Sequence, residues 1–148
     1  MKLEIKKIIK KFKSTLAVNN ISFEIEKNKT LGLLGPNGCG KTTSIGMMLG
    51  LITPTSGEVL IDGISFEPKN RIYLLSVMNF ASPYIELPKK LTVKQNLDVY
   101  ARLYGVKNIK DRISEMVEDL NLESFLNKKT GELSSGQKNR VSLAKSLI

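Results

Sequence analysis

Hydrophobic and polar residues follow two different periods along the chain, which predicts strands and helices in mixed order. Short apolar or alternating runs bounded by turn residues are typical of strands, and apolar residues three and four positions apart indicate one face of a helix. The clearest helical spacing runs from Val93 to Tyr104, and Gly105 is a natural stop. The predicted strands are residues 3–9, 21–26, 30–34, 58–61 and 71–77, and the predicted helices are residues 43–51, 93–104, 109–122 and about 137–148.

A glycine-rich segment connects the predicted strand 30–34 to the predicted helix 43–51. It reads GPNGCGKT over residues 35–42 and matches the phosphate-loop pattern G-x-x-x-x-G-K-[ST] at every fixed position. Glycines let successive backbone N–H groups turn toward a phosphate, and the start of the following helix adds unpaired N–H groups and a positive dipole end. The segment therefore predicts a P-loop nucleotide site.

Three side chains of this loop have distinct expected roles. Lys41 would place its ammonium against the β- and γ-phosphates, and the Thr42 hydroxyl is a hard oxygen ligand suited to Mg²⁺. Cys39 occupies a variable position, and we interpret it as a packing or bystander residue. The predicted nucleotide-binding residues are Gly35, Pro36, Asn37, Gly38, Cys39, Gly40, Lys41, Thr42 and Thr43, with Thr42 as the predicted metal ligand.

A second motif, LSSGQ, occupies residues 133–137 and is followed by Lys138, Asn139 and Arg140. At this distance after a phosphate loop it resembles the signature LSGGQ of the ABC ATPase family, which opens a helix. The resemblance implies that the Ser134 hydroxyl and the Gly136 N–H contact ATP held by the phosphate loop of a second subunit. Ser135 stands where the family usually has glycine, and its side chain is small enough to keep that geometry.

Other segments extend the resemblance over essentially the whole chain. The stretch LGLITPTSGEVLIDG at residues 49–63 is similar to the family's sequence after the phosphate-loop helix, and LTVKQNLDVYARLYG at residues 91–105 resembles export-type members. Phe12 lies where the family carries an aromatic residue that stacks on adenine. A phenylalanine of the hydrophobic core is the alternative interpretation of Phe12.

The sequence departs from the family pattern in two places. The family has a glutamine after the strand near Val77, whereas here the proline-bearing loop 79–90 contains none, so Asn79 is the nearest amide. Gln95 is no substitute, because it lies in a predicted helix. The family's Asp-Glu strand and histidine loop follow the signature helix, whereas this chain ends at Ile148 and contains no histidine. The catalytic residues are therefore unknown, and we interpret the chain as truncated after the signature motif.

The composition is that of a globular protein, with 41% hydrophobic and 25% charged residues among 148. Its longest apolar runs, such as residues 72–77, are too short to span a bilayer, and the N-terminus lacks the continuous apolar segment of a signal peptide. A single cysteine excludes an internal disulfide framework and fits a reducing cytoplasm. We therefore expect a cytoplasmic protein whose membrane association comes through a partner.

The net charge of +9 is concentrated at the N-terminus, where six of the first thirteen residues are lysines. Such a cluster can form a surface for nucleic acid or anionic lipid, or it can be the solvated face of a strand. No aromatic residues alternate with arginines as an RNA-stacking surface would need. We favour the solvated strand and expect no nucleic-acid partner.

Together these patterns predict an α/β fold, with a P-loop NTPase core sheet at about residues 1–79 and an inserted helical subdomain at about 80–140. Residues 141–148 would begin the return to the core. The implied function is that of an ATP-binding subunit, with ATP and Mg²⁺ as cofactors, coupling hydrolysis to export. Its partners would be membrane-spanning subunits and a second ATP-binding subunit, at the inner face of the cell membrane. A truncated, non-hydrolytic ATP-binding remnant and a soluble ABC protein acting on ribosomes or nucleic acid stay open as alternatives. GTPases would need guanine-reading motifs, which we do not find.

Overall fold

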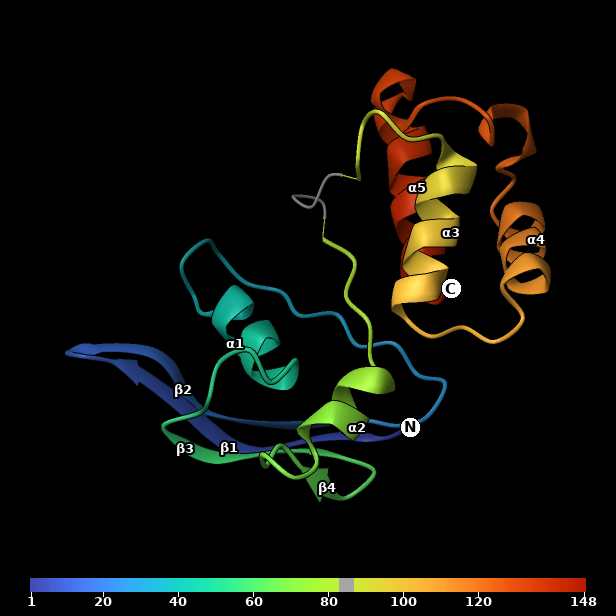
Figure 1. The fold of residues 1–148 in the computed structure, drawn as a ribbon. Helices are drawn as coiled ribbons and strands as arrows, with labels where there is room; N and C mark the ends of the chain where they lie inside the picture. Colours follow the sequence, from blue (N-terminus) through green and yellow to red (C-terminus); the bar gives the residue numbers. More distant parts are fainter. Residues whose placement is uncertain (83–86) are drawn as a thin grey trace. The chain divides into compact units, whose positions relative to one another are not determined.

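The computed structural model describes residues 1–82 and 87–148 (Figure 1). The chain forms two compact units, Met1–Met78 and Asn79–Ile148. Residues 83–86 of the predicted loop 79–90 lie outside the described residues. Each unit has its own hydrophobic core, so each is considered separately below.

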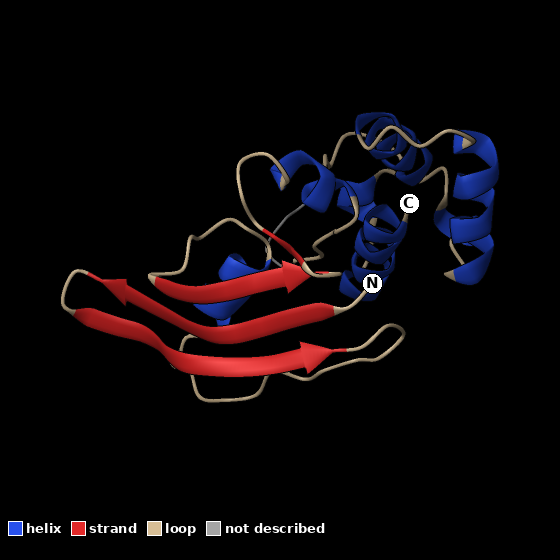
Figure 2. Ribbon diagram, turned by 90° about the horizontal axis from the view of Figure 1, so that it is seen from below, coloured by secondary structure: helices blue, strands red, loops and turns tan. Residues whose placement is uncertain are grey.

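The first unit is built on a four-stranded antiparallel sheet in the order β2-β1-β3-β4 (Figure 2). One apolar face of the sheet packs against helix α1 (Lys41–Met48). Met47 of α1 lies in one buried cluster with Ile5, Ile8, Val18 and Val59 from three strands. The elements are β1 (Leu3–Phe12), β2 (Thr15–Ile25), α1 (Lys41–Met48), β3 (Ser56–Ile61), β4 (Ile64–Ser65) and α2 (Arg71–Ser76).

Two of the predicted strands are wrong. Residues 30–34 are irregular, with Leu34 91% exposed. Backbone groups of a buried strand need a neighbouring strand on each side, and within the described residues none pairs with this segment. Residues 71–77 were predicted as a strand, but Arg71–Ser76 form the helix α2. Only Leu74 is buried within α2, and a short apolar run does not by itself distinguish a strand from a helical turn.

The second unit is helical, and the predicted helices are confirmed with small shifts at their ends. Among the described residues, its buried core joins the three α-helices and includes Leu97, Val117 and Val141. Within the part of the chain that the structure describes, no helix has both the length and the apolar character needed to cross a bilayer. The elements are α3 (Val93–Leu103), α4 (Ile109–Asp119), η1 (Glu123–Phe125), η2 (Thr130–Glu132) and α5 (Ser135–Leu147).

Lysines of the N-terminal cluster find partners on neighbouring strands and loops. Lys2 forms ion pairs with Glu24 and Glu26 at 2.9 and 3.0 Å, and hydrogen bonds to these carboxylates hold the pKa of Lys2 above its ordinary value. The Lys10 ammonium donates to the carbonyl oxygen of Thr53 at 2.8 Å. The carboxylates of Glu24 and Glu26 thus balance part of the positive charge of the cluster, which fits a solvated strand face.

Candidate nucleotide-binding site

The phosphate loop of residues 35–42 takes a backbone conformation that requires glycine. Gly38 and Gly40 have φ angles of 84° and 93°, in the left-handed region that other residues rarely adopt. At Gly40 there is also no room for a side chain, because a Cβ atom would lie 2.3 Å from the carbonyl oxygen of Ala17. A Cβ atom at Gly38 would meet no heavy atom within 4 Å among the described residues. The sheet therefore fixes one end of the loop at Gly40 and leaves Gly38 open to solvent.

The Lys41 side chain turns back into the loop. Its ammonium donates to the carbonyl oxygens of Gly35 and Pro36 at 2.7 and 2.8 Å, and lies 3.8 Å from the Cys39 sulfur. Both oxygens are neutral acceptors. A phosphate oxygen would be a stronger acceptor for the same ammonium, since charge-assisted hydrogen bonds are roughly twice as strong as neutral ones. The loop therefore holds a cation at the position where an anion would enter.

Helix α1 begins immediately after this loop. Gly40 is its N-cap residue, and within the described residues no side chain caps the helix. Its first intrahelical bond runs from the Ser44 N–H to the Gly40 carbonyl at 2.8 Å, which leaves the N–H groups of the first turn without helical partners. Unpaired N–H groups and the helix dipole both favour an anion at this end. Thr42 is exposed and Thr43 half-buried on this first turn.

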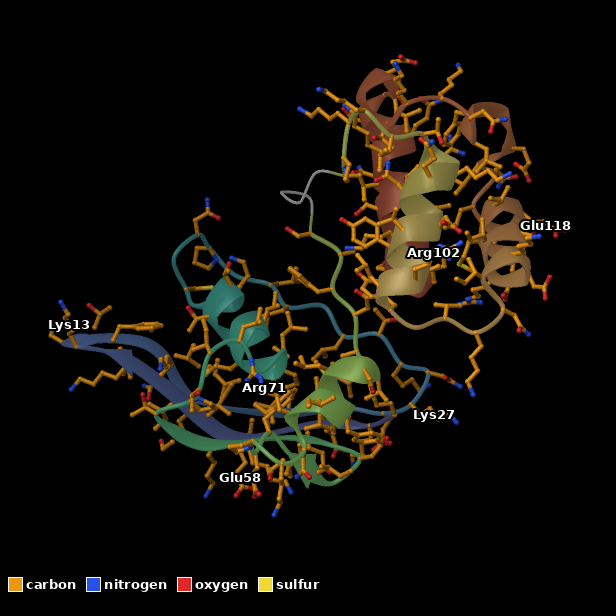
Figure 3. All side chains as sticks on the ribbon, viewed as in Figure 1. Lys13, Lys27, Glu58, Arg71, Arg102 and Glu118 are labelled. Atoms are coloured by element: carbon orange, nitrogen blue, oxygen red, sulfur yellow. The ribbon has the colours of Figure 1, made fainter. Side chains whose placement is uncertain are left out.

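Phe12 is the last residue of β1, on the β1–β2 hairpin whose tip carries Lys13 (Figure 3). It is 47% exposed and lies outside the hydrophobic cores of the described residues. The Lys10 ammonium lies 4.9 Å from the centroid of its ring. Phe12 pairs with Thr15 across the hairpin, and Ala17, two residues further along β2, contacts Gly40. The structure thus places Phe12 on the strand pair that supports the phosphate loop.

Ser134 and Gly136 lie in the second unit, at the beginning of α5. Ser134 is the N-cap residue, and its hydroxyl accepts from the Gln137 N–H at 3.3 Å, while the Gln137 side chain accepts from the Ser134 N–H at 2.9 Å. This capping box fixes the first turn of the helix. Both Ser134 and Gly136 are exposed, so the turn presents its hydroxyl and backbone to solvent.

Arg140, one helical turn later, fastens α5 to the end of α4. Its guanidinium donates to the carbonyl oxygen of Asn121 at 3.1 Å and lies 5.0 Å from the centroid of the Phe125 ring. Cations are favourable beside the carbonyl groups that end a helix. From the sequence Arg140 was identified only as part of the motif, because Asn121 and Phe125 precede it by 19 and 15 residues and no local pattern indicates such contacts.

Asn79 and Gln95, the two side-chain amides discussed in place of the family's glutamine, form hydrogen bonds with residues close to them in the sequence. The Asn79 side-chain oxygen accepts from the next backbone N–H, that of Phe80, at 2.8 Å. Gln95 lies in α3 as expected and forms a capping box with Thr92. The pattern Thr-x-x-Gln at residues 92–95 and Ser-x-x-Gln at 134–137 is the sequence signal of such boxes, and it could have placed the first residues of both helices.

Comparison with known proteins supports the same family from sequence and structure. Residues 18–148 match the ABC transporter family. The chain is 36% identical over 141 residues to the Nod factor export ATP-binding protein I of Rhizobium sp. (strain N33), covering 94% of this chain and 46% of that protein. It is 40% identical over 147 residues to the zinc import ATP-binding protein ZnuC of Rickettsia bellii (strain RML369-C), covering 99% of this chain and 57% of that protein.

A solved structure shows the same fold. The dimeric, post-hydrolysis ATP-binding cassette MJ0796 bound to ADP and Pi superposes with a TM-score of 0.80 and 25% identity, covering 97% of this chain and 68% of that chain. The predicted α/β P-loop NTPase class is thus confirmed. The chain spans about half the length of the two relatives named above. With its glycine-constrained loop, the following helix and a family match over residues 18–148, this chain belongs to the ABC transporter family.

Proposed function

We propose that this chain forms the phosphate-binding and signature-bearing part of an ABC transporter's ATP-binding subunit, which couples ATP binding and hydrolysis to export. The observation that carries this proposal is the phosphate loop itself. Its backbone is constrained at Gly40 by the sheet, its cation Lys41 is held inside by two neutral carbonyl oxygens, and an uncapped helix begins at its end. All three features favour a polyphosphate anion at one place.

Mg²⁺ fits the donor set at this place. Thr42 offers one exposed hydroxyl oxygen on the first turn of α1, next to Lys41. Mg²⁺ prefers octahedral oxygen coordination and usually takes most of its ligands from substrate phosphates and water, so a single protein hydroxyl is a suitable share. When bound, Mg²⁺ would neutralise negative charge on the phosphates. The chain's own contribution is to hold the phosphates with Lys41 and the loop N–H groups.

Phe12 is proposed to stack on adenine, because its exposed ring offers an apolar face on the hairpin that supports the loop. Stacking uses the π-face, which adenine and guanine share, so base selectivity is expected to be small. Phe12→Ala should weaken ATP binding roughly 3- to 10-fold, since aromatic contacts contribute about 0.5–1.5 kcal/mol, whereas Phe12→Tyr should bind ATP normally. Unchanged ATP affinity in Phe12→Ala, with a lowered melting temperature, would favour a purely structural residue.

Ser134 and Gly136 are proposed to contact ATP held by a second ATP-binding subunit. The membrane-spanning subunits are proposed to receive the resulting motion at the inner face of the membrane.

A mixing experiment tests the contact across the dimer. Lys41→Ala and Ser134→Gly should each abolish hydrolysis in the complete protein, and mixing the two variants should restore part of it. Glycine is the replacement for Ser134 because, at an N-cap, it lowers the stability of the protein by only a few tenths of a kcal/mol.

The reason for the recovery is geometric. A mixed dimer has one nucleotide site with both lesions and one site with neither, if each site combines the phosphate loop of one subunit with the signature of the other. If both elements act within one subunit, every site in the mixed dimer carries a lesion and no activity returns. The mixing experiment therefore distinguishes a shared site from a self-contained one.

Export is the proposed direction because residues 91–105 resemble export-type members. Cells whose only copy carries Lys41→Ala should then become more sensitive to the transported compound or retain it. A new requirement for an external nutrient would instead indicate import.

A further inference from the structure

Two segments of the helical unit, residues 88–94 and 126–131, are joined side by side by backbone hydrogen bonds. The first segment leads into α3, and the second leads toward the beginning of α5. An isolated β-bridge between Thr92 and Lys129 marks the middle of the contact. Four backbone N–H groups donate to backbone carbonyl oxygens across the contact: Val93 to Lys128 at 3.0 Å, Lys94 to Leu126 at 2.9 Å, Thr130 to Leu91 at 3.0 Å and Gly131 to Lys89 at 3.1 Å.

Two buried polar side chains, Asn96 and Thr130, form further hydrogen bonds between the two segments. They are 1% and 2% exposed. The Thr130 hydroxyl donates to the carbonyl oxygen of Pro88 at 2.7 Å, and the Asn96 amide donates to the Thr130 hydroxyl at 3.4 Å and to the Pro88 carbonyl at 3.2 Å. The Asn96 amide nitrogen is paired, whereas its side-chain oxygen has no hydrogen-bond partner among the described residues. The bonds that are made connect Asn96, Thr130 and Pro88 in one network, which holds its members in one arrangement.

Thr130 is linked to Ser134 by a short, anchored stretch of chain. It begins the 3-10 helix η2, whose last turn closes with the Leu133 N–H donating to the Thr130 carbonyl at 3.5 Å. Leu133 is 5% exposed and packs in the hydrophobic core. Ser134 follows immediately as the N-cap of α5. The position of Ser134 relative to α3 is thus set by the Asn96–Thr130 pair on one side and by Leu133 on the other.

We propose that Asn96 and Thr130 are positioning residues for ATP hydrolysis, which act by holding the Ser134 end of α5 in place. The proposal rests on the proposed function of Ser134. A group that contacts a nucleotide must be held within a fraction of an ångström, and its supporting side chains provide that precision. Asn96, Thr130 and Ser134 belong to the helical unit, whereas the phosphate loop and Phe12 belong to the other unit. The pair is therefore expected to affect turnover and not nucleotide capture.

The test uses three variants of the complete protein. Thr130→Val keeps the shape of the side chain but removes the hydroxyl, and Thr130→Ser keeps the hydroxyl. Ser146→Ala is the matched control. It also removes a side-chain hydroxyl that donates to a backbone carbonyl, that of Leu143, but at the end of α5 away from Ser134. We expect kcat for ATP hydrolysis to fall about 10- to 100-fold in Thr130→Val, because a small displacement of Ser134 would misalign it with the nucleotide. KM for ATP should stay within about twofold, and the serine and control variants should resemble the wild type.

Hydrogen exchange gives a second measurement that does not depend on hydrolysis. The amide hydrogens of Gln137 and Lys138, which bond to Ser134, should exchange faster in Thr130→Val and at the wild-type rate in Ser146→Ala. Unchanged exchange in Thr130→Val would overturn the positioning proposal whether or not the protein hydrolyses ATP. So would a wild-type kcat in Thr130→Val when Lys41→Ala is inactive, a result that would leave the proposed function intact.

Discussion

Replacing Lys41 with alanine is expected to weaken ATP binding roughly 10- to 150-fold, since a hydrogen bond to a charged group contributes about 1.5–3 kcal/mol. The Lys41 ammonium is the cation that the loop encloses, and its present acceptors are the neutral carbonyl oxygens of Gly35 and Pro36. Its removal leaves the backbone N–H groups of the loop and of α1 in place, so some phosphate binding should survive. Calorimetric titration of the folded protein with ATP and Mg²⁺ measures the change.

The control for this variant is Lys27→Ala. It removes the same charge from the same unit, at the end opposite the hairpin tip that carries Lys13 (Figure 3). A general loss of positive charge would weaken ATP binding equally in both variants. Equal affinity of the wild type and of Lys41→Ala would rule out the loop as the nucleotide site, provided that both proteins are folded.

Gly40→Ala is expected to lower both the melting temperature and the affinity for ATP far more than Gly38→Ala. Both substitutions place alanine in the left-handed region, at φ angles of 93° and 84°, where an ordinary residue loses about 1–2 kcal/mol. Only at Gly40 would the new Cβ atom also overlap backbone, since the Ala17 carbonyl oxygen is 2.3 Å away. The shared backbone strain therefore cancels between the two variants, and the difference reports the contact with β2.

Thermal unfolding without nucleotide separates the two effects of this substitution. In Gly40→Ala either the loop or β2 must move, and a moved loop no longer directs its N–H groups to one point. Equal melting temperatures for Gly38→Ala and Gly40→Ala would contradict the close packing of the loop against the sheet.

Local sequence patterns predicted the elements whose signals lie within a few neighbouring residues. The helix from Val93 is one case, because its apolar spacing and its Thr92–Gln95 capping box are both contained in one short segment. The phosphate loop is another, because eight consecutive residues carry its glycines, its lysine and its hydroxyl. The signature segment was recognised in the same way, although the exact first residue of α5 required the capping box at Ser134.

Elements that depend on distant partners were not predictable in this way. Residues 30–34 and 71–77 are both short and mainly apolar, and whether such a run becomes a strand depends on a neighbouring strand with free backbone groups. In the structure, residues 30–34 are irregular, and most of residues 71–77 form the helix α2.

The sequence alone determined that this protein carries a phosphate loop and a signature motif, because both are contiguous patterns whose chemistry depends on residue type and spacing. Only the tertiary structure decided what holds them in place. The Ala17 carbonyl that excludes a side chain at Gly40 is on another strand, and Thr130 meets Asn96 across 34 residues of sequence. Packing brings these groups together through burial and backbone pairing, and neither is specified by a pattern of neighbouring residues.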